Sequence, residues 1–242
     1  MFAALNEISN LEKWVHDQTS AILLDEINLL GKSIEINPPN ISTVHNAIIR
    51  FMEIFVSALA IIILFPFLLL VAIIIRVDSP GNPIFSQLRW GRNNEKVTIH
   101  KFRSMYIDQS DKSGTKQAVS NDIRITKIGG YIRKTSVDEL PQIYDVLRGK
   151  ISLAGPRVHP IKMYAGGQLY EDFSDKYFNR HLVKPGITGL AQCTGFRGET
   201  LKAKDAAGRI YCDLYFVRNY SLKLYIAVLI YTGLKIVRLK LS

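Results

Sequence analysis

Apolar side chains recur three or four positions apart near the N-terminus, which predicts two short amphipathic helices. The first pattern consists of Leu5, Ile8, Leu11 and Val15, and the second consists of Ile22, Leu23, Ile27 and Leu30. The Pro38-Pro39 pair then ends the helical pattern. We find no catalytic motif in this region, and we interpret residues 1–45 as an amphipathic extension.

A continuous apolar run follows at residues 54–75, twenty-two positions whose only polar side chain is Ser57. As a helix this run would measure roughly 33 Å, enough for a hydrocarbon core of about 30 Å. Helices buried in soluble proteins rarely stay apolar on every face for so long. A signal peptide is excluded because the run begins far from Met1 and follows an acidic stretch. The pattern predicts a membrane helix within residues 46–77.

Pro66 lies near the middle of this run, where it removes one backbone hydrogen bond and predicts a kink. A spanning helix would place residues 1–50 outside the cell, because the basic body that follows favours the cytoplasm. A sharp kink would instead let the helix dip into one leaflet and return, with both flanks in the cytoplasm. The sequence leaves both topologies open, and we expect the re-entrant one.

Short elements and turns make up the rest of the chain, so residues 78–242 are predicted to form one cytoplasmic domain. The pattern predicts strands at 84–89 and 96–102 across a turn at 91–94, a loop at 104–122, helical segments at 136–149 and 203–218, and Gly- and Pro-rich turns at 150–200. The predicted fold class is α+β: a membrane-embedded, kinked helix followed by a compact, mainly helical domain with short strands.

The C-terminal segment, residues 222–241, has an uncharged centre at 224–234 between Lys223 and Lys235. Eleven residues are too few to span a membrane. A helix with an apolar centre and cationic ends suits the surface of an anionic leaflet. The same pattern also fits a helix packed on the core of the domain, and the sequence does not separate the two.

Charge is distributed unevenly along the chain, which has 31 basic and 21 acidic side chains. Residues 1–50 hold three basic and six acidic side chains, whereas residues 76–242 hold 28 and 14. The basic part is therefore expected to meet anionic lipids or phosphates. Cys193 and Cys212 form neither a disulfide framework nor a zinc pattern, which favours a reducing compartment.

Two adjacent carboxylates, Asp138 and Glu139, stand at the start of a predicted helix. Ser136 and Glu139 fit a helix-capping box, which is the purely structural interpretation. The surrounding cations, however, exceed what two carboxylates need; they are Lys101, Arg103, Arg124, Arg133, Lys134 and Arg157. Such a surplus suits phosphates, and carboxylates among cations and phosphates commonly bind Mg²⁺. A carboxylate in this setting can instead attack phosphorus, and the nearby cations should keep the pKa of Asp138 low.

Five motifs follow one another in the same part of the chain. They are Ser79-Pro-Gly-Asn-Pro-Ile-Phe-Ser-Gln-Leu-Arg89, Lys101-Phe-Arg-Ser-Met105, Arg133-Lys-Thr-Ser-Val-Asp-Glu-Leu-Pro-Gln142, Gly155-Pro-Arg157 and Lys184-Pro-Gly-Ile-Thr-Gly-Leu-Ala-Gln192. In this order they resemble the bacterial sugar transferases, the monotopic phosphoglycosyl transferases. The resemblance covers about residues 46–242. It departs from the usual pattern at Phe65, where the family often has a serine before the proline.

The resemblance implies an enzyme of the bacterial inner membrane whose catalytic domain faces the cytoplasm. It would transfer a sugar-1-phosphate from a UDP-sugar to undecaprenyl phosphate, release UMP and use Mg²⁺, in the first membrane step of polysaccharide or glycoconjugate assembly. Asp138 would be the nucleophile of a phosphosugar-aspartyl intermediate, and Glu139 a metal ligand. The substrate-binding cations would be Lys101, Arg103, Arg133 and Arg157, and Asp213 would be a second metal ligand. The chain resembles the short form of the family, and residues 195–200 resemble members that transfer a hexose.

Two other classes of protein remain as alternatives. A membrane-tethered nucleic-acid-binding protein would explain the basic domain, but the sequence has no zinc-finger spacing and no RNA-binding aromatic motif, so we expect no nucleic-acid partner. A non-catalytic scaffold of a polysaccharide assembly complex would keep the fold without the activity. Retention of Lys101, Asp138, Glu139 and Arg157 together argues against a scaffold. The sequence leaves open whether the chain forms a homo-oligomer.

Overall fold

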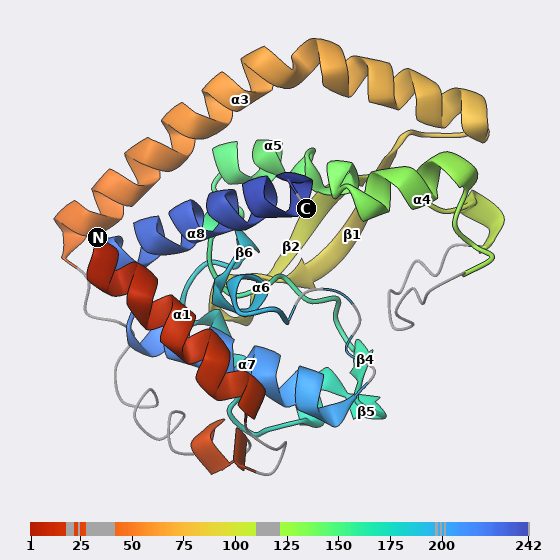
Figure 1. Cartoon of the computed structure of the whole chain (residues 1–242). Helices are drawn as coiled ribbons and strands as arrows, with labels where there is room; N and C mark the ends of the chain where they lie inside the picture. Colours follow the sequence, from red (N-terminus) through yellow and green to blue (C-terminus); the bar gives the residue numbers. More distant parts are fainter. Residues whose placement is uncertain are drawn as a thin grey trace.

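The computed structural model describes residues 1–17, 22–23, 25–27, 42–109, 122–196, 198, 200 and 202–241, with side chains up to residue 235. Figure 1 shows one long helix, α3 (Thr43–Asp78), arching over a domain of shorter helices and small sheets. This architecture confirms the predicted α+β class. The second predicted N-terminal helix and the predicted loop at 104–122 lie mostly outside the described residues.

The predicted hairpin is present and forms the sheet nearest to the candidate site. Strands β1 (Ile84–Trp90) and β2 (Lys96–Phe102) pair antiparallel, with Phe85 opposite Lys101. The turn between them contains η1 (Arg92–Asn94), where Asn93 and Asn94 have positive φ. Asparagine tolerates this left-handed backbone better than most residues, which explains why the chain reverses here.

The segment that precedes the two carboxylates folds differently from the sequence prediction. A helix, α4 (Lys127–Lys134), begins at Thr126, whose hydroxyl accepts a hydrogen bond from the Gly129 amide. The predicted helical segment from Ser136 to Gly149 forms as two short pieces, η3 (Val137–Glu139) and α5 (Gln142–Leu147), and not as one helix. Ser136 has a φ of 59°, which separates η3 from the preceding α4.

The Gly- and Pro-rich region contains short, tightly packed elements, as predicted. Strands β3 (Ser152–Ala154) and β6 (Gly186–Thr188) pair in parallel, and β4 (Tyr164–Ala165) pairs with β5 (Gln168–Leu169). The remaining short elements are η2 (Ile107–Gln109), η4 (Tyr170–Asp172), η5 (Tyr177–Leu182) and α6 (Leu190–Cys193). Glycine is required where β3 and β6 meet, because a Cβ on Gly186 would overlap the backbone of Gly155.

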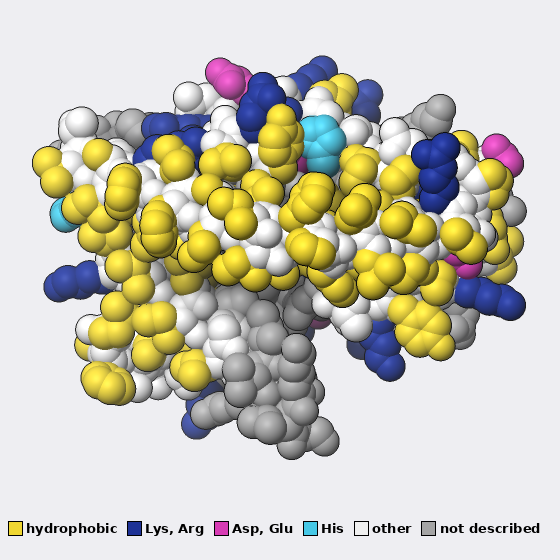
Figure 2. Space-filling view, turned by 90° about the horizontal axis from the view of Figure 1, so that it is seen from above, with side chains coloured by type: hydrophobic (Ala, Val, Ile, Leu, Met, Phe, Trp, Pro, Cys, Tyr) yellow, Lys and Arg dark blue, Asp and Glu magenta, His cyan; other side chains and the backbone are white. Residues whose placement is uncertain are grey.

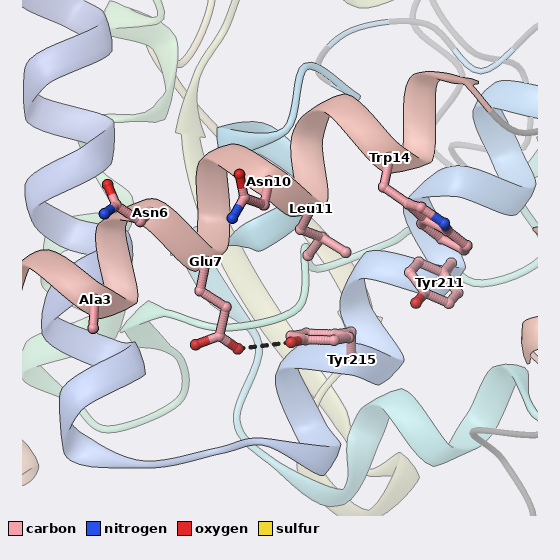
Figure 3. A pocket seen from close by; sticks show the side chains of 8 residues that line it. All are labelled: Ala3, Asn6, Glu7, Asn10, Leu11, Trp14, Tyr211 and Tyr215. Atoms are coloured by element: carbon pink, nitrogen blue, oxygen red, sulfur yellow. Dashed lines mark hydrogen bonds between the residues drawn. The ribbon is translucent and has the colours of Figure 1, made fainter.

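The main hydrophobic core lies among α1 (Phe2–Asp17), α6, α7 (Ala203–Arg218) and α8 (Leu222–Leu241). The predicted amphipathic pattern of α1 is confirmed, because Ile8, Leu11 and Val15 are buried in this core. A groove between α1 and α7 is lined by Trp14 and Tyr211, among others (Figure 3). None of the predicted site residues lines this groove.

Helix α8 packs on the domain with its first half. Leu224, Tyr225, Ala227 and Val228 are buried, whereas Ile230 and Leu234 are exposed. This packing supports the core interpretation for the start of α8. A location of its second half at the membrane surface stays a prediction.

Helix α3 is long and apolar enough to cross a membrane, as predicted for this part of the chain. It runs continuously through Pro66, and Figure 1 shows it bent into an arch. Its buried side chains occur only near the two ends of the helix, at Ile49, Glu53, Ser57, Val71 and Ile75. Seen from above, the hydrophobic side chains form a band along this helix (Figure 2). The exposed centre is what distinguishes α3 from the core helix of a soluble protein.

One arginine at each end of α3 fixes the helix to the domain. Arg50 donates hydrogen bonds to the carbonyls of Val146 and Leu147 at distances of 2.8 and 2.7 Å, at the C-terminus of α5. At the other end, Arg103 donates to the carbonyls of Ser79 and Pro80, both at 2.5 Å, just beyond the C-terminus of α3. Carbonyls at helix ends lack partners within the helix, so these arginines complete their bonding. Both flanks of the apolar segment therefore lie on the same domain.

A buried carboxylate strengthens the first of these attachments. Glu53, on the first half of α3, is 2% exposed. It accepts hydrogen bonds from the Ser152 hydroxyl at 2.5 Å, the Tyr225 hydroxyl at 3.1 Å and the Arg50 guanidinium at 3.2 Å. A buried charge is tolerated only when it is paired and hydrogen-bonded, so this contact specifies where α3 lies on the domain.

Candidate active site

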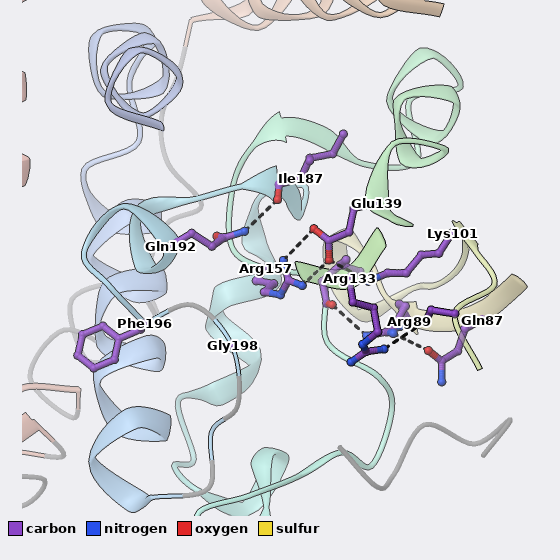
Figure 4. A network of polar contacts seen from close by, with 12 residues as sticks. Gln87, Arg89, Lys101, Arg133, Glu139, Arg157, Ile187, Gln192, Phe196 and Gly198 are labelled. Carbon is purple, nitrogen blue, oxygen red and sulfur yellow. Dashed lines mark hydrogen bonds and ion pairs between the residues drawn. The ribbon is translucent and has the colours of Figure 1, made fainter. Parts of the chain in front are cut away.

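The two carboxylates lie in a cluster of cations contributed by separate elements. Glu139, at the end of η3, accepts hydrogen bonds from Lys101 Nζ at 2.9 Å and from Arg157 Nη2 at 2.6 Å, both on its Oε1 atom. Figure 4 shows Glu139 between these two cations. The structure therefore brings together three residues that are 38 and 18 positions apart in the sequence.

This arrangement strongly favours the ionised form of the Glu139 side chain. Burial alone would raise the pKa of Glu139, but the charges and hydrogen bonds of Arg157 and Lys101 lower it well below its usual value of 4.5. Burial lowers the pKa of Lys101, whereas Glu139 raises the pKa of Arg157. The three side chains form one hydrogen-bonded cluster.

Asp138 occupies a different environment from its neighbour. Its side chain is buried, and burial raises the pKa of Asp138 above its usual value, although Lys101, Arg133 and Arg157 act in the opposite direction. The prediction of a low pKa is therefore wrong. The sequence showed the nearby cations but not the loss of solvent, and the cost of burying the charge is the larger effect here.

The helix-capping interpretation of Ser136 and Glu139 is also wrong. Ser136 makes no side-chain capping hydrogen bond, and its left-handed backbone precedes a 3-10 turn rather than an α-helix. The Glu139 carboxylate points toward Lys101 and Arg157 instead of back toward the start of the turn. These contacts remove the structural explanation for the acidic pair.

Lys101 is positioned by a contact between β2 and α5. The buried carboxylate of Asp145 accepts a hydrogen bond from the backbone amide of His100 at 2.8 Å, and it lies 2.7 Å from the ring Nδ1 of His100. This pair fixes the strand against the helix that follows Glu139. Lys101, the next residue along β2, therefore lies within reach of Glu139.

Arg157 is positioned by its backbone. Arg180, which is fully buried in η5, donates a hydrogen bond to the Arg157 carbonyl at 2.6 Å. The turn that carries Arg157 is also joined to β6, through a hydrogen bond of 2.9 Å from the Gly186 amide to the Pro156 carbonyl. The Arg157 guanidinium is thus directed from a well-fixed turn toward Glu139.

Two further arginines belong to the cluster. Arg133, at the end of α4, lies 3.4 Å from the Ser104 hydroxyl, and its charge acts on Asp138. Arg89, on β1, donates to Gln87 at 2.5 Å and to the Val158 carbonyl at 3.3 Å. Burial and the neighbouring Arg157 lower the pKa of Arg89 to about 9. Four cations therefore accompany two carboxylates, and this surplus favours an anionic substrate.

The structure does not bring all of the predicted site residues together. Arg103 is 6% exposed and binds carbonyls at the end of α3, as described above. Asp213, on α7, is fully buried and paired with Arg180, whose Nε donates to its carboxylate at 3.1 Å. The predicted roles of Arg103 as a substrate-binding residue and Asp213 as a metal ligand gain no support from these contacts.

The acidic pair fits a magnesium ion that is held jointly with a substrate. Among the described residues, no group of three or more His, Cys, Asp or Glu side chains could hold a metal. Mg²⁺, however, is usually bound by one or two carboxylates together with substrate phosphates. Asp138 and Glu139 could supply such carboxylates, and the four cations could bind the phosphates.

Several residues of the site were not predicted from the sequence. Arg89 is the last residue of the first motif. Its membership of the cluster becomes visible only in the structure, where β1 pairs with β2. Asp145, His100 and Arg180 act through contacts between elements that are far apart in the sequence. A pattern read from one sequence carries no signal for such contacts.

Comparisons with known proteins show what this chain is similar to. A family model described as "Bacterial sugar transferase" matches residues 44–239. The chain is 51% identical over 173 residues to the exopolysaccharide production protein PSS of Rhizobium leguminosarum bv. phaseoli. The aligned region covers 72% of this chain and 86% of that protein.

Two longer relatives have more specific names. An undecaprenyl-phosphate glucose phosphotransferase of Komagataeibacter xylinus is 44% identical over 76% of this chain and 34% of its own length. A UDP-glucose:undecaprenyl-phosphate glucose-1-phosphate transferase of Escherichia coli (strain K12) is 38% identical over 81% of this chain and 41% of its own length. The chain thus spans well under half of these two relatives.

Proposed function

Because this chain belongs to the bacterial sugar transferase family and is a phosphoglycosyl transferase, we propose that it transfers a sugar-1-phosphate from a UDP-sugar to undecaprenyl phosphate and releases UMP. The observation that carries this proposal is the buried Asp138 beside the ion-paired Glu139, among Lys101, Arg133 and Arg157. Several cations suit a reaction between two phosphate-bearing substrates, and a carboxylate can serve it as a nucleophile or a metal ligand.

We assign the first chemical step to Asp138. A carboxylate oxygen of Asp138 attacks the phosphorus that carries the sugar, and the bond from this phosphorus to the UMP oxygen breaks. UMP leaves with the bonding electron pair, and the sugar-1-phosphate stays bonded to Asp138. An oxygen of undecaprenyl phosphate then attacks the same phosphorus, which forms the lipid diphosphate and frees the carboxylate.

The two carboxylates are suited to different tasks. Burial raises the pKa of Asp138, and a carboxylate that is poorly solvated is a more reactive nucleophile once it is ionised. Glu139 is held ionised by Lys101 and Arg157, so it provides a stable negative charge for a metal. Mg²⁺, when bound at Glu139, would neutralise charge on the phosphate oxygens of the donor.

The cations would bind and orient the donor. Lys101 and Arg157 flank Glu139, and Arg89 lies beside them. Burial lowers the pKa of Arg89 to about 9, so its guanidinium is still protonated near neutral pH. A bound diphosphate would supply negative charge that balances the positive charge of these side chains. The same groups would stabilise the charge that develops as UMP leaves.

Helix α3 supports a location at the membrane. Its exposed apolar centre supports membrane association, and both of its ends are fixed to the same domain by Arg50 and Arg103. We infer that α3 enters one leaflet and returns, with the domain in the cytoplasm, where UDP-sugars are available. This position gives the site access to a soluble donor and to a lipid acceptor in turn.

Release of UMP by the purified protein tests the proposal. UDP-glucose and UDP-galactose would each be mixed with the protein, Mg²⁺ and undecaprenyl phosphate in detergent micelles. We expect UMP and a lipid-linked sugar with at least one donor. A folded protein that releases no UMP with either donor, in the presence of both the lipid and the metal, would instead indicate a scaffold.

A further inference from the structure

The N-terminal helix contacts the segment that follows α6 through the side chain of His16. His16, at the end of α1, lies with its Nε2 atom 2.7 Å from the carbonyl oxygen of Thr194, and its ring stacks on Phe196 at a centroid distance of 4.9 Å. We propose that α1 is a clamp, in which His16 is a positioning residue that fixes this segment and, through α6, the turn that carries Arg157. The proposal rests on the proposed function for its kinetic consequence.

The contact of His16 is specific rather than a general packing contact. The two stacked rings are nearly parallel, with an interplanar angle of 9°. Gly195, between the two contacted residues, has a φ of 90°, and a Cβ there would lie 2.8 Å from His16 Nε2. Lys204, on α7, also donates to the His16 carbonyl at 2.7 Å. The end of α1 is therefore fixed both to the segment after α6 and to α7.

Arg209 holds the same segment from the side of α7. Its Nη2 atom donates to the carbonyls of Phe196 and Gly198, both at 2.9 Å. Arg209 is buried, and its charge interacts with those of Arg157, Asp213 and Arg180. The segment clamped by His16 is therefore adjacent to the buried charges that position Arg157.

Helix α6 links the clamped segment to the Arg157 turn. Thr194 and Phe196 donate backbone hydrogen bonds of 2.9 Å to Leu190 and Ala191 of α6, so the end of this four-residue helix moves with them. At its beginning, a Cβ on Gly189 would overlap the carbonyl oxygen of Gly155. Because α6 is short and its backbone is packed against the turn, a displacement of the segment after α6 should also displace the turn that carries Arg157.

The remainder of α1 is docked well enough to act as a clamp. Its apolar face is buried in the main core, and Glu12 accepts hydrogen bonds from Tyr231 at 2.7 Å and Lys235 at 2.6 Å on α8. Glu7 accepts one from Tyr215 on α7 at 2.6 Å (Figure 3). Helix α1 precedes residue 44, where the family match begins, so the clamp is additional to the part that the family shares.

His16→Ala tests the clamp, with Glu7→Ala as the matched control. Each substitution removes one hydrogen bond between α1 and its neighbours, but only His16 touches the segment after α6. His16→Gln serves as a rescue variant, because a glutamine amide can still donate a hydrogen bond to the Thr194 carbonyl. All three would be compared with the wild type in the full-length protein.

Hydrogen exchange gives the readout that does not depend on activity. In His16→Ala we expect faster exchange of the Thr194 and Phe196 amides and also of the Gly155 amide, which bonds to the Thr188 carbonyl. Glu7→Ala should leave these amides at the wild-type rate. Equal exchange in both variants, or faster exchange at Thr194 without any change at Gly155, would overturn the proposed coupling.

The kinetic readout is the KM for the UDP-sugar in the UMP-release assay. We expect His16→Ala to raise this KM about three- to tenfold, because Arg157 would be less well positioned for the donor. Glu7→Ala should keep the wild-type KM, and His16→Gln should restore most of it. An unchanged KM in His16→Ala refutes the link to Arg157. If the wild type itself releases no UMP, the proposed function fails, and the exchange result alone decides the clamp.

Discussion

Asp213 accepts hydrogen bonds from Arg180, and both side chains are fully buried. The same guanidinium donates to the carbonyl of Arg157, whose own side chain reaches Glu139. Asp213 is therefore connected to the acidic pair through two arginines. Burial raises the pKa of Asp213, while Arg180 acts against this effect.

Asp213→Asn is predicted to lower stability without changing the requirement for Mg²⁺. The substitution leaves the buried Arg180 without its counter-charge, which should cost about 3–5 kcal/mol of unfolding free energy. Urea unfolding in detergent measures this loss, and Asp205→Asn near the start of the same helix should stay within about 0.5 kcal/mol. If Asp213 is a metal ligand, Asp213→Asn would instead raise the Mg²⁺ concentration for half-maximal UMP release several-fold.

Asp138→Asn is predicted to abolish turnover in a folded protein. Because burial raises the pKa of Asp138, its ionisation opposes folding, and this cost grows as the pH rises through the pKa in the folded state. A permanently neutral asparagine avoids that cost, so the variant should be at least as stable as the wild type at pH 8. Thermal unfolding measures the stability.

A donor labelled with ³²P on the phosphate next to the sugar tests the intermediate. After an acid quench, the wild type should retain label on the protein, and Asp138→Asn should retain none. A variant that turns over at a substantial fraction of the wild-type rate would show that the lipid phosphate attacks the donor directly.

Glu139→Gln is predicted to change both metal dependence and acid stability. The pKa of Glu139 in the folded protein lies well below 4.5, so its stabilising charge is fully present above that pH and is lost as the pH falls through the folded value. At pH 7 the variant should be less stable by about 3 kcal/mol, because Lys101 and Arg157 lose their counter-charge. This difference should shrink progressively below pH 4.5. A constant difference down to pH 2 would contradict the ion pairs, and an unchanged Mg²⁺ requirement would contradict metal binding by Glu139.

A cysteine at Asn10 is predicted to be protected in intact spheroplasts. Asn10 is exposed on α1, which packs on the domain that we place in the cytoplasm. In a background without Cys193 and Cys212, an impermeant thiol reagent should label this position only after the membrane is opened. Labelling in intact spheroplasts at the level of an external control would show that α3 spans the membrane.

The sequence predicted those parts of the fold that local patterns determine. The length of the apolar run predicted α3, and alternating residues around the Gly91–Asn94 turn predicted the hairpin. The acidic pair and three of its cations, Lys101, Arg133 and Arg157, were also found, because the resemblance marked them by type and order. Such features depend on residues that are close in the chain or lie in recognisable motifs.

Where the structure differs from what the sequence suggested, the cause lies in contacts and burial that only the complete fold creates. Arg103 stands two residues from Lys101 on the chain, yet its guanidinium reaches the end of α3 rather than the acidic pair. The pKa of Asp138 depends on how completely the fold excludes water, which neighbouring charges in the sequence do not reveal. The left-handed backbone at Ser136 likewise gave no signal, because serine is not a residue that favours it.

The attachment of α3 at both ends also bears on how the protein responds to its lipid environment. A spanning helix adapts to thin or thick bilayers by changing its tilt. Helix α3 would have less of this freedom, because Arg50 and Arg103 attach its two ends to the same domain. The depth of the apolar arch relative to Glu139 is therefore set by the protein and not by the acyl-chain length of the surrounding lipids. Such a protein would keep its site at the same height above the hydrocarbon as the membrane thickness varies.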